Sequence, residues 1–148
     1  MDKPNRKVAV FICQGCDIGK SLDVEALEKV AHDQGGVAVC RPHPFLCGDE
    51  GVGLIKQEIQ AGASHVVIAG CSPRFQTHTF AFDGCFTERV NLRELVVWSH
   101  KPGDEDSQML AEDYLRMGIV RAQKAEVPEP FRRRSTTRFS SSAAGKAG

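Results

Sequence analysis

Residues 7–12, KVAVFI, are the stretch that decides the fold. They form a short apolar run rich in branched side chains, with charged residues before it and glycine soon after it. Such a run is typical of a strand that is buried on both faces, as in a parallel sheet. The same pattern returns in VAVC, residues 37–40, and in HVVIAG, residues 65–70. A fourth, less regular strand is predicted in CFTERVNL, residues 85–92.

Helical patterns separate and follow these strands. We predict helices over residues 24–34, 52–62, 72–82 and 107–126. Asp23 and Ser72 are the candidate N-caps of the first and third helices, and Asp104 or Asp106 is that of the last. The last helix is expected to be amphipathic, with the spacing of one face set by Met109, Leu110, Tyr114, Met117 and Val120 or Arg121.

Strands that alternate with helices predict an α/β fold, in which a parallel sheet lies between two helical layers. Right-handed crossovers leave few topologies for such a sheet. We therefore expect a small doubly wound sheet of about four strands, flavodoxin-like, with the strand order 2-1-3-4.

Charge is distributed unevenly along the 148 residues. The chain has 19 basic and 19 acidic residues, but five basic and no acidic residues follow Glu129, so the preceding part has a net charge of −5. An acidic body does not suit a nucleic-acid-binding surface. We expect an N-terminal extension over 1–6, one α/β domain over 7–126 and a disordered basic tail over 127–148. The RRRS run at 132–135 could bind an acidic partner, receive phosphate or be solvated tail.

Hydropathy predicts a cytoplasmic protein. No stretch approaches the roughly 18 consecutive apolar residues of a membrane span, and the N-terminal apolar run is too short for a secretory signal.

Cysteines are the residues with the clearest chemical potential. The six are Cys13, Cys16, Cys40, Cys47, Cys71 and Cys85. Disulfides rarely persist in a reducing compartment, so clustered cysteines there indicate metal or redox chemistry. In an open parallel sheet, ligands bind beyond the carboxyl ends of the strands. Cys13 and Cys71 end or follow the first and third strands, Cys16 completes a C-x-x-C, and Cys47 follows the second strand. We therefore expect four thiols to converge at this edge.

Several kinds of site fit four convergent thiols. Thiolates suit an iron–sulfur cluster or a zinc ion equally well. A redox dithiol of Cys13 and Cys16 is a further hypothesis, weakened because residues 17–19 intervene where a thioredoxin-type helix should begin. Inert packing is another, since a free cysteine packs as a small hydrophobe. For Cys40, at a strand end, and Cys85, in a turn, packing is the prediction.

Other polar residues follow the predicted strands. Arg74 could place a positive charge beside the thiols, dock an acidic partner or lie on a solvated surface. Asn91, Arg93 and Glu94 could position the loops by hydrogen bonds, or Arg93 and Glu94 could form a solvated pair. Trp98 is expected to pack the last helix against the sheet.

Six segments carry a family resemblance: VAVFICQGC, PFLCGDEGVGLIKQEI, HVVIAGCSPR, NLREL, WSH and YLRMGIVRAQKA. In this order, over approximately residues 6–125, the chain resembles the N-terminal domain of the heterodisulfide reductase A-type chain (HdrA). CSPR at 71–74 and NLRE at 91–94 are the most specific matches. The resemblance implies an iron–sulfur domain that passes electrons in anaerobic metabolism and precedes a flavin-binding domain.

A dinucleotide fingerprint is missing, because no G-x-G-x-x-G follows any predicted strand. We therefore expect a small electron-transfer subunit, not an enzyme by itself. Its partners would be larger oxidoreductase subunits that contain a flavin or a cluster.

The resemblance also implies a ligand set. The ligands carried over are Cys13, Cys47 and Cys71, with Cys16 added by proximity, for a [4Fe-4S] cluster in preference to [2Fe-2S]. This chain has C-Q-G-C where the family has C-x-C, and Val96 where the family often has a cysteine. Cys16 or Cys85 could replace the cysteine ligand that is missing at Val96. The C-x-x-C pattern is also similar to the hydrogenase delta subunit, which binds a two-iron cluster.

Overall fold

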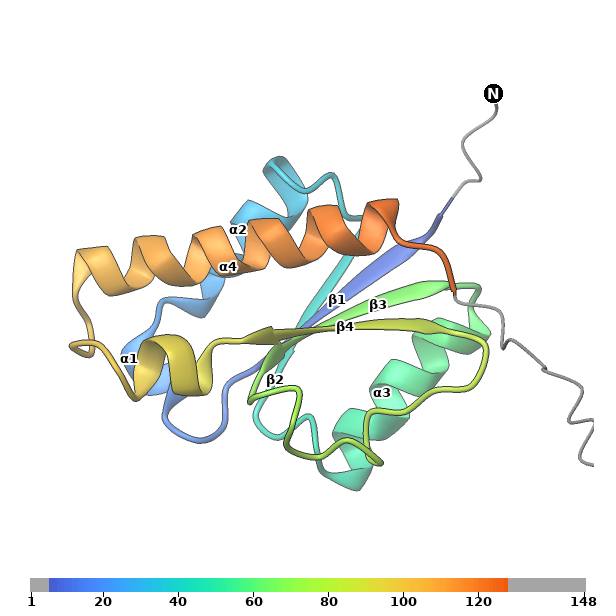
Figure 1. Ribbon diagram of the computed structural model, residues 1–148, viewed down its shortest axis with the longest axis horizontal. Coiled ribbons are helices and arrows are strands. Elements are labelled where there is room, and N and C mark those ends of the chain that lie inside the picture. The colour runs from blue at the N-terminus through green and yellow to red at the C-terminus, as the bar shows by residue number, and fades with distance from the viewer. Residues whose placement is uncertain (1–5, 128–148) are drawn as a thin grey trace, which may run out of the picture.

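A four-stranded parallel sheet lies between two helical layers (Figure 1). The structure, a computed structural model, describes residues 6–127, so the basic run at 132–135 and nearly all of the predicted extension and tail lie outside the described residues. The strands are β1 (Val8–Cys13), β2 (Val39–His43), β3 (His65–Gly70) and β4 (Phe86–Asn91). All pairs are parallel, in the order β2-β1-β3-β4. The predicted fold class and strand order are confirmed.

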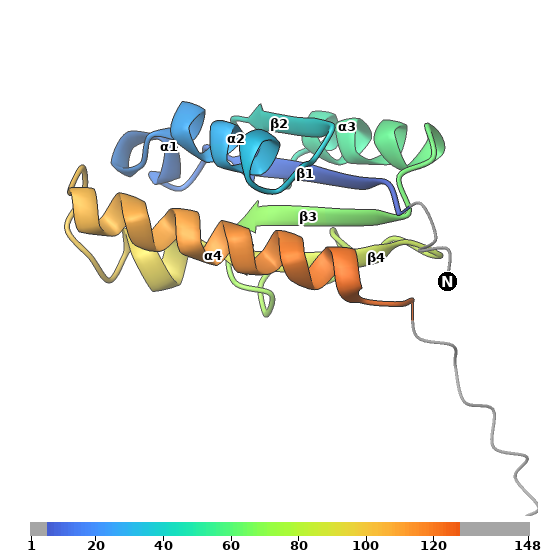
Figure 2. The same cartoon turned by 90° about the horizontal axis from the view of Figure 1, so that it is seen from above.

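Helices cover both faces of the sheet. They are α1 (Ile18–Ser21), α2 (Val24–Asp33), α3 (Asp49–Gln60), the π-helix η1 (Arg93–Val97) and α4 (Glu105–Lys124). In Figure 1, α2 and α4 lie above the sheet and α3 lies below it. Figure 2 shows α1 and the start of α4 beyond the carboxyl ends of the strands. Within residues 6–127, no helix is long and apolar enough to cross a membrane.

The core has two parts because side chains alternate along each strand. On β1, Val10 and Ile12 pack against α2 and α4, whereas Ala9 and Phe11 pack on the α3 side. All four are fully buried. Burial of a large apolar side chain contributes roughly 1.5–3 kcal/mol, so both faces of β1 stabilise the sheet. This two-sided burial explains why the strands read as continuous apolar runs.

Residues 72–82 form turns, so the helix predicted there is wrong. Gln76 has a positive φ of 54°, which a right-handed helix does not allow. Phe80 is buried on the α3 side, and its ring lies 4.5 Å from the guanidinium carbon of Arg89. This contact with β4 outweighs the helix signal of the favourable start at Ser72 and Pro73.

The buried face of α4 differs in part from the prediction, because Leu110 and Tyr114 pack against the core but the methionines do not. Met109 and Met117 are more than half exposed. The residues that face the sheet are Ala111, Leu115, Gly118, Ile119 and Ala122. A Cβ on Gly118 would collide with the side chain of Val90. Small residues therefore set the close approach of α4 to the sheet, and the larger methionines remain outside.

Candidate functional site

Four cysteines line one pocket at the carboxyl edge of the sheet. Cys13 ends β1, Cys71 follows β3, Cys16 lies in the turn after β1, and Cys47 lies in the loop before α3. We call this the thiol pocket; its other walls include Gly15, Ile18, Leu46, Ile68, Gly70, Phe75, Phe80 and Arg93. Residues from three separate segments of the chain thus meet, as the predicted topology requires.

The thiols share a pocket without converging on one point. The pocket has a cavity volume of about 40 Å³. Among residues 6–127, no three His, Cys, Asp or Glu side chains are arranged to hold a metal ion. A zinc site needs four ligands roughly 2.0–2.3 Å from one centre, whereas the cysteines of a cluster bind different iron atoms. Soft thiolates on several sides of a pocket fit the donor set of a cluster.

Two glycines allow the segments to come together. A Cβ on Gly15 would lie 2.7 Å from the carbonyl oxygen of Pro44, and one on Gly70 would lie 3.0 Å from the Cβ of Cys13. Side chains at these positions would push the turn after β1 away from the loop before α3, and β3 away from Cys13. A Cβ on Gly48, in contrast, would have only ordinary contacts.

Left-handed backbone follows the first thiol. Cys16 and Asp17 have φ values of 53° and 67°, which are unfavourable for residues other than glycine. The one-turn helix α1 then begins at Ile18. A one-turn helix therefore begins soon after the C-x-x-C with only Asp17 between them, so the expectation that residues 17–19 all intervene is wrong for residues 18 and 19.

Arg89, on β4, lies beside Cys71. Its Nη2 atom donates hydrogen bonds to the Sγ of Cys71 at 3.2 Å and to the carbonyl oxygens of Ser72 at 3.0 Å and Phe75 at 3.1 Å. No sequence motif marks Arg89 as a site residue. The parallel register pairs it with Ile68, so a correct pairing of β3 and β4 was the signal that could have found it.

Arg93 is the second guanidinium at the pocket, and its side chain is only 9% exposed. Its Nη1 donates to the Sγ of Cys16 at 3.4 Å, while Nη2 and Nε donate to the Oε1 of Glu94 at 2.7 and 3.1 Å. The guanidinium carbon lies 4.9 Å from the ring centre of Phe75 and 4.5 Å from that of Trp98. Trp98 is 62% exposed, so it covers Arg93 and does not pack the last helix as predicted.

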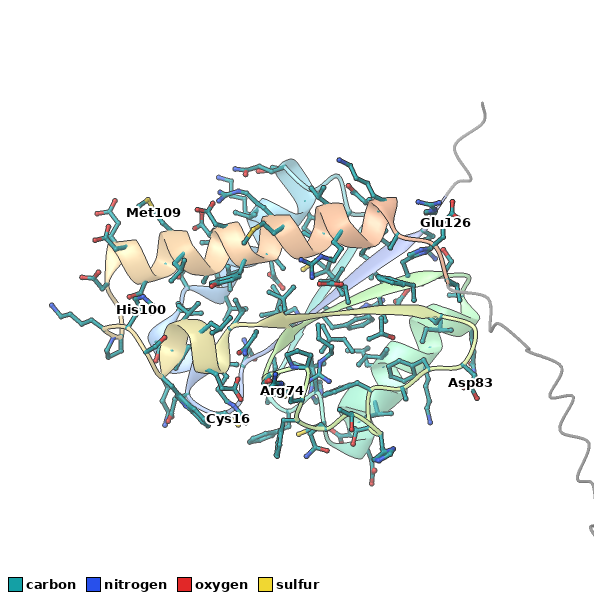
Figure 3. All side chains as sticks on the ribbon, viewed as in Figure 1. Cys16, Arg74, Asp83, His100, Met109 and Glu126 are labelled. Carbon is teal, nitrogen blue, oxygen red and sulfur yellow. The ribbon has the colours of Figure 1, made fainter. Side chains whose placement is uncertain are left out.

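Glu94 connects the two thiol segments. Its Oε2 accepts a hydrogen bond from the backbone N–H of Ser72 at 2.8 Å, and its own N–H donates to the Oδ1 of Asn91 at 3.0 Å. These hydrogen bonds agree with the predicted positioning of the loops by Asn91, Arg93 and Glu94, which stays a prediction, and Arg93 and Glu94 do not form only a solvated pair. Arg74, labelled in Figure 3, is exposed and follows Cys71 by three residues. Among the described residues, the guanidinium groups that donate to sulfur are those of Arg89 and Arg93, not that of Arg74.

Burial and charge act against each other at these groups. Burial raises the pKa of Cys71, and the positive charges of Arg89 and Arg93 offset only part of that rise. Burial lowers the pKa of Arg89, although Cys71 opposes this. Burial also acts to lower the pKa of Arg93, but its hydrogen bonds to Glu94 and Cys16 outweigh burial and leave the pKa raised. Arginine pKa values begin so high that both groups remain cationic.

Cys40 and Cys85 lie away from the thiol pocket. Cys85 precedes β4 at the amino edge, where its buried thiol lies 3.6 Å from the carbonyl oxygen of Phe86. Cys40 lies within β2 against the α2 and α4 side of the core, and burial raises its pKa to about 12. Val96 is fully buried in the same part of the core. These placements agree with packing and leave Cys16 as the fourth thiol at the pocket.

The sequence of this chain is similar to those of several curated proteins. No protein-family model matches the chain. It is 36% identical over 135 residues to the A-type chain of the H(2)/formate:CoB-CoM heterodisulfide,ferredoxin reductase of Methanococcus maripaludis, a match that covers 83% of this chain. It is 34% identical over 126 residues, 79% of this chain, to the A-type chain of the ferredoxin:CoB-CoM heterodisulfide reductase of Methanosarcina mazei.

A third relative is the first A-type iron-sulfur subunit of the CoB--CoM heterodisulfide reductase of Methanopyrus kandleri, 31% identical over 134 residues and 84% of this chain. The matches cover 20%, 16% and 20% of these three relatives. The chain thus spans about a fifth of the length of the curated relatives that it matches.

Proposed function

This chain is homologous to a segment of HdrA, the A-type chain of heterodisulfide reductases, and from that premise we propose that it is an iron–sulfur electron-transfer component of an oxidoreductase complex. The ligands would be Cys13, Cys16, Cys47 and Cys71. The observation that carries the proposal is that these four thiols line one pocket. The name of the Methanopyrus kandleri relative, an iron-sulfur subunit, supports the same cofactor class.

A [4Fe-4S] cluster is favoured over [2Fe-2S] as the cofactor, and when bound it supplies one-electron redox chemistry. The chain's own residues would hold it and set its surroundings. Leu46, Ile68 and Phe80 are buried at the pocket and would exclude water from its inner side. Arg89 and Arg93 already donate to two of the four sulfur atoms. This chain would therefore relay electrons and leave substrate chemistry to another subunit.

The proposed partners are larger subunits that contain a flavin or another cluster. The relatives named above are subunits of heterodisulfide reductases, which supports assembly with other chains. We place this assembly in the cytoplasm.

A redox dithiol is the second candidate function. Cys16 is exposed, and α1 begins two residues after it, which is closer to a thioredoxin-type arrangement than the sequence suggested. In that case Cys13 and Cys16 would exchange two electrons by forming and opening a disulfide.

A reductive titration of the full chain, purified anaerobically, separates these functions. We expect reversible uptake of about one electron per chain, with an EPR signal of a reduced cluster. Uptake of two electrons without iron or an EPR signal would support the dithiol instead. Bound zinc and no electron uptake would indicate a structural metal site, and would reject electron transfer.

A further inference from the structure

Two guanidinium groups beside the thiol pocket contact two different cysteine sulfur atoms. Arg89 Nη2 lies 3.2 Å from the Sγ of Cys71, and Arg93 Nη1 lies 3.4 Å from the Sγ of Cys16. Resting on the proposed function, we infer that Arg89 and Arg93 raise the reduction potential of the centre held by these thiols. They are positioning and tuning residues, with Glu94 as the group that limits the effect of Arg93.

The physical reason is that reduction adds negative charge to the centre. Hydrogen bonds to its sulfur atoms and nearby positive charge stabilise the reduced form more than the oxidised form. Such interactions are stronger in a partly buried site than in water. Both guanidiniums would therefore make the centre a better electron acceptor.

Arg93 is held so that it cannot turn away from the sulfur. Three of its nitrogen atoms are engaged, Nη1 by Cys16 and the other two by Glu94, while the rings of Phe75 and Trp98 lie against its guanidinium. The planar fork of arginine can serve both acceptors at once, whereas the compact ammonium of lysine cannot do so in the same geometry. The Arg93 contact with sulfur is thus built into the fold.

Arg89 differs because no carboxylate pairs with it among the residues described. Its Nη2 donates to Cys71 and to carbonyl oxygens of the loop after β3. Its Nε atom is buried and has no hydrogen-bond partner within residues 6–127. Arg93, in contrast, has its charge offset by Glu94 at 2.7 Å. We therefore expect Arg89 to raise the potential more than Arg93 does.

The test measures midpoint potentials of the full chain loaded anaerobically with ferrous iron and sulfide. Arg89→Gln should lower the equilibrium constant for one-electron reduction about tenfold, which corresponds to roughly 59 mV. Arg93→Gln should lower it by less. Glu94→Gln should raise it, because the carboxylate that offsets Arg93 is lost. The matched control is Arg74→Gln, which changes an arginine whose guanidinium makes no hydrogen bond to sulfur among the described residues. Because Arg74 is exposed and its charge is screened by water and salt, the potential should stay unchanged.

Arg89→Gln and Glu94→Gln should shift the midpoint potential in opposite directions. General damage to the site would not reverse the direction of the shift according to the sign of the charge removed. If a glutamine variant fails to fold or load iron, Arg89→Lys and Arg93→Lys keep the charge and should give smaller decreases. Equal iron content with unchanged or raised potentials in the arginine variants would overturn this inference alone. A wild-type chain that takes up no iron would overturn the proposed function as well.

Discussion

The two edges of the sheet differ in which residues adopt a left-handed backbone conformation. At the amino edge, turns that need a left-handed backbone have glycine, as at Gly36, Gly62 and Gly84 with φ values of 61°, 99° and 73°. Beyond the carboxyl edge, Gly103 before α4 also has a positive φ of 67°, but Cys16 and Asp17 adopt that conformation without glycine. Left-handed backbone at other residues costs on the order of 1–3 kcal/mol and tends to occur at functional sites. Strain thus lies at the edge that holds the thiol pocket.

Cysteine itself shows the same contrast. At the amino edge, Cys85 is buried near backbone carbonyl groups. At the carboxyl edge, Cys16 and Cys47 are exposed, and Cys71 lies beside a guanidinium. One residue type is therefore buried in packing at one edge and lines a pocket at the other.

The largest expected effect is loss of iron from the carboxyl edge only. Cys71→Ser should remove nearly all bound iron and the visible charge-transfer absorption, because a soft ligand is replaced by a hydroxyl. Cys85→Ser, at the amino edge, should retain both. Iron analysis of the two purified variants tests this, and equal retention in both would show that the edges do not differ in metal binding.

The second largest expected effect is a difference in alkylation rate between exposed Cys47 and the half-buried Cys40. In the metal-free chain at pH 8, Cys47 should be alkylated at least about 100-fold faster than Cys40, because the thiolate is the reactive form and Cys40 has a pKa of about 12. The rate at Cys40 should rise with pH up to about 12, since its thiol loses its proton only in that range. Mass spectrometry of time points gives both rates, and similar rates at pH 8 would contradict the burial assigned to Cys40.

Two glycine-to-alanine substitutions should distinguish a glycine that lets two segments come close from a glycine that only allows a positive φ. Gly15→Ala should cost about 1–3 kcal/mol of unfolding free energy and reduce iron binding, because its Cβ would press on Pro44. Gly62→Ala has open space but a positive φ, so it should cost about 1 kcal/mol and leave iron content unchanged. Denaturant unfolding and iron analysis provide the readouts. Normal iron binding by Gly15→Ala would show that this close approach does not hold the site together.

The smallest expected effect is relief of strain at the carboxyl edge. Asp17→Gly should raise the unfolding free energy by about 0.5 kcal/mol, since glycine adopts a positive φ without steric cost but loses more chain entropy on folding. Gly84→Ala, the amino-edge control, should lower it. Urea unfolding of the two variants measures both changes. A decrease for Asp17→Gly would indicate that Asp17 makes a stabilising contribution greater than its strain.

The strands and the meeting of the four cysteines at one edge could be predicted from the sequence, because both depend on the parallel topology of the sheet. Continuous apolar runs identify strands buried on both faces, and the strand order then brings the residues after β1, β2 and β3 to one edge. The meeting of Cys13, Cys47 and Cys71 was therefore predictable from strand positions alone. Cys16 followed from its short distance along the chain.

The parts that were missed depend on contacts between distant residues. The loop at 72–82 is shaped by Phe80 packing under Arg89, which local propensity cannot reveal. Hydropathy highlighted Met109 and Met117 on α4, although the helix approaches the sheet through small residues such as Gly118. The role of Arg89 required the register between β3 and β4.

Counting iron and acid-labile sulfide in the full chain after anaerobic reconstitution tests the central claim most directly. We expect about four of each per chain, as a four-iron cluster bound by four cysteines requires. A protein that is correctly folded yet binds neither iron nor sulfide would contradict the account, however closely its four thiols lie.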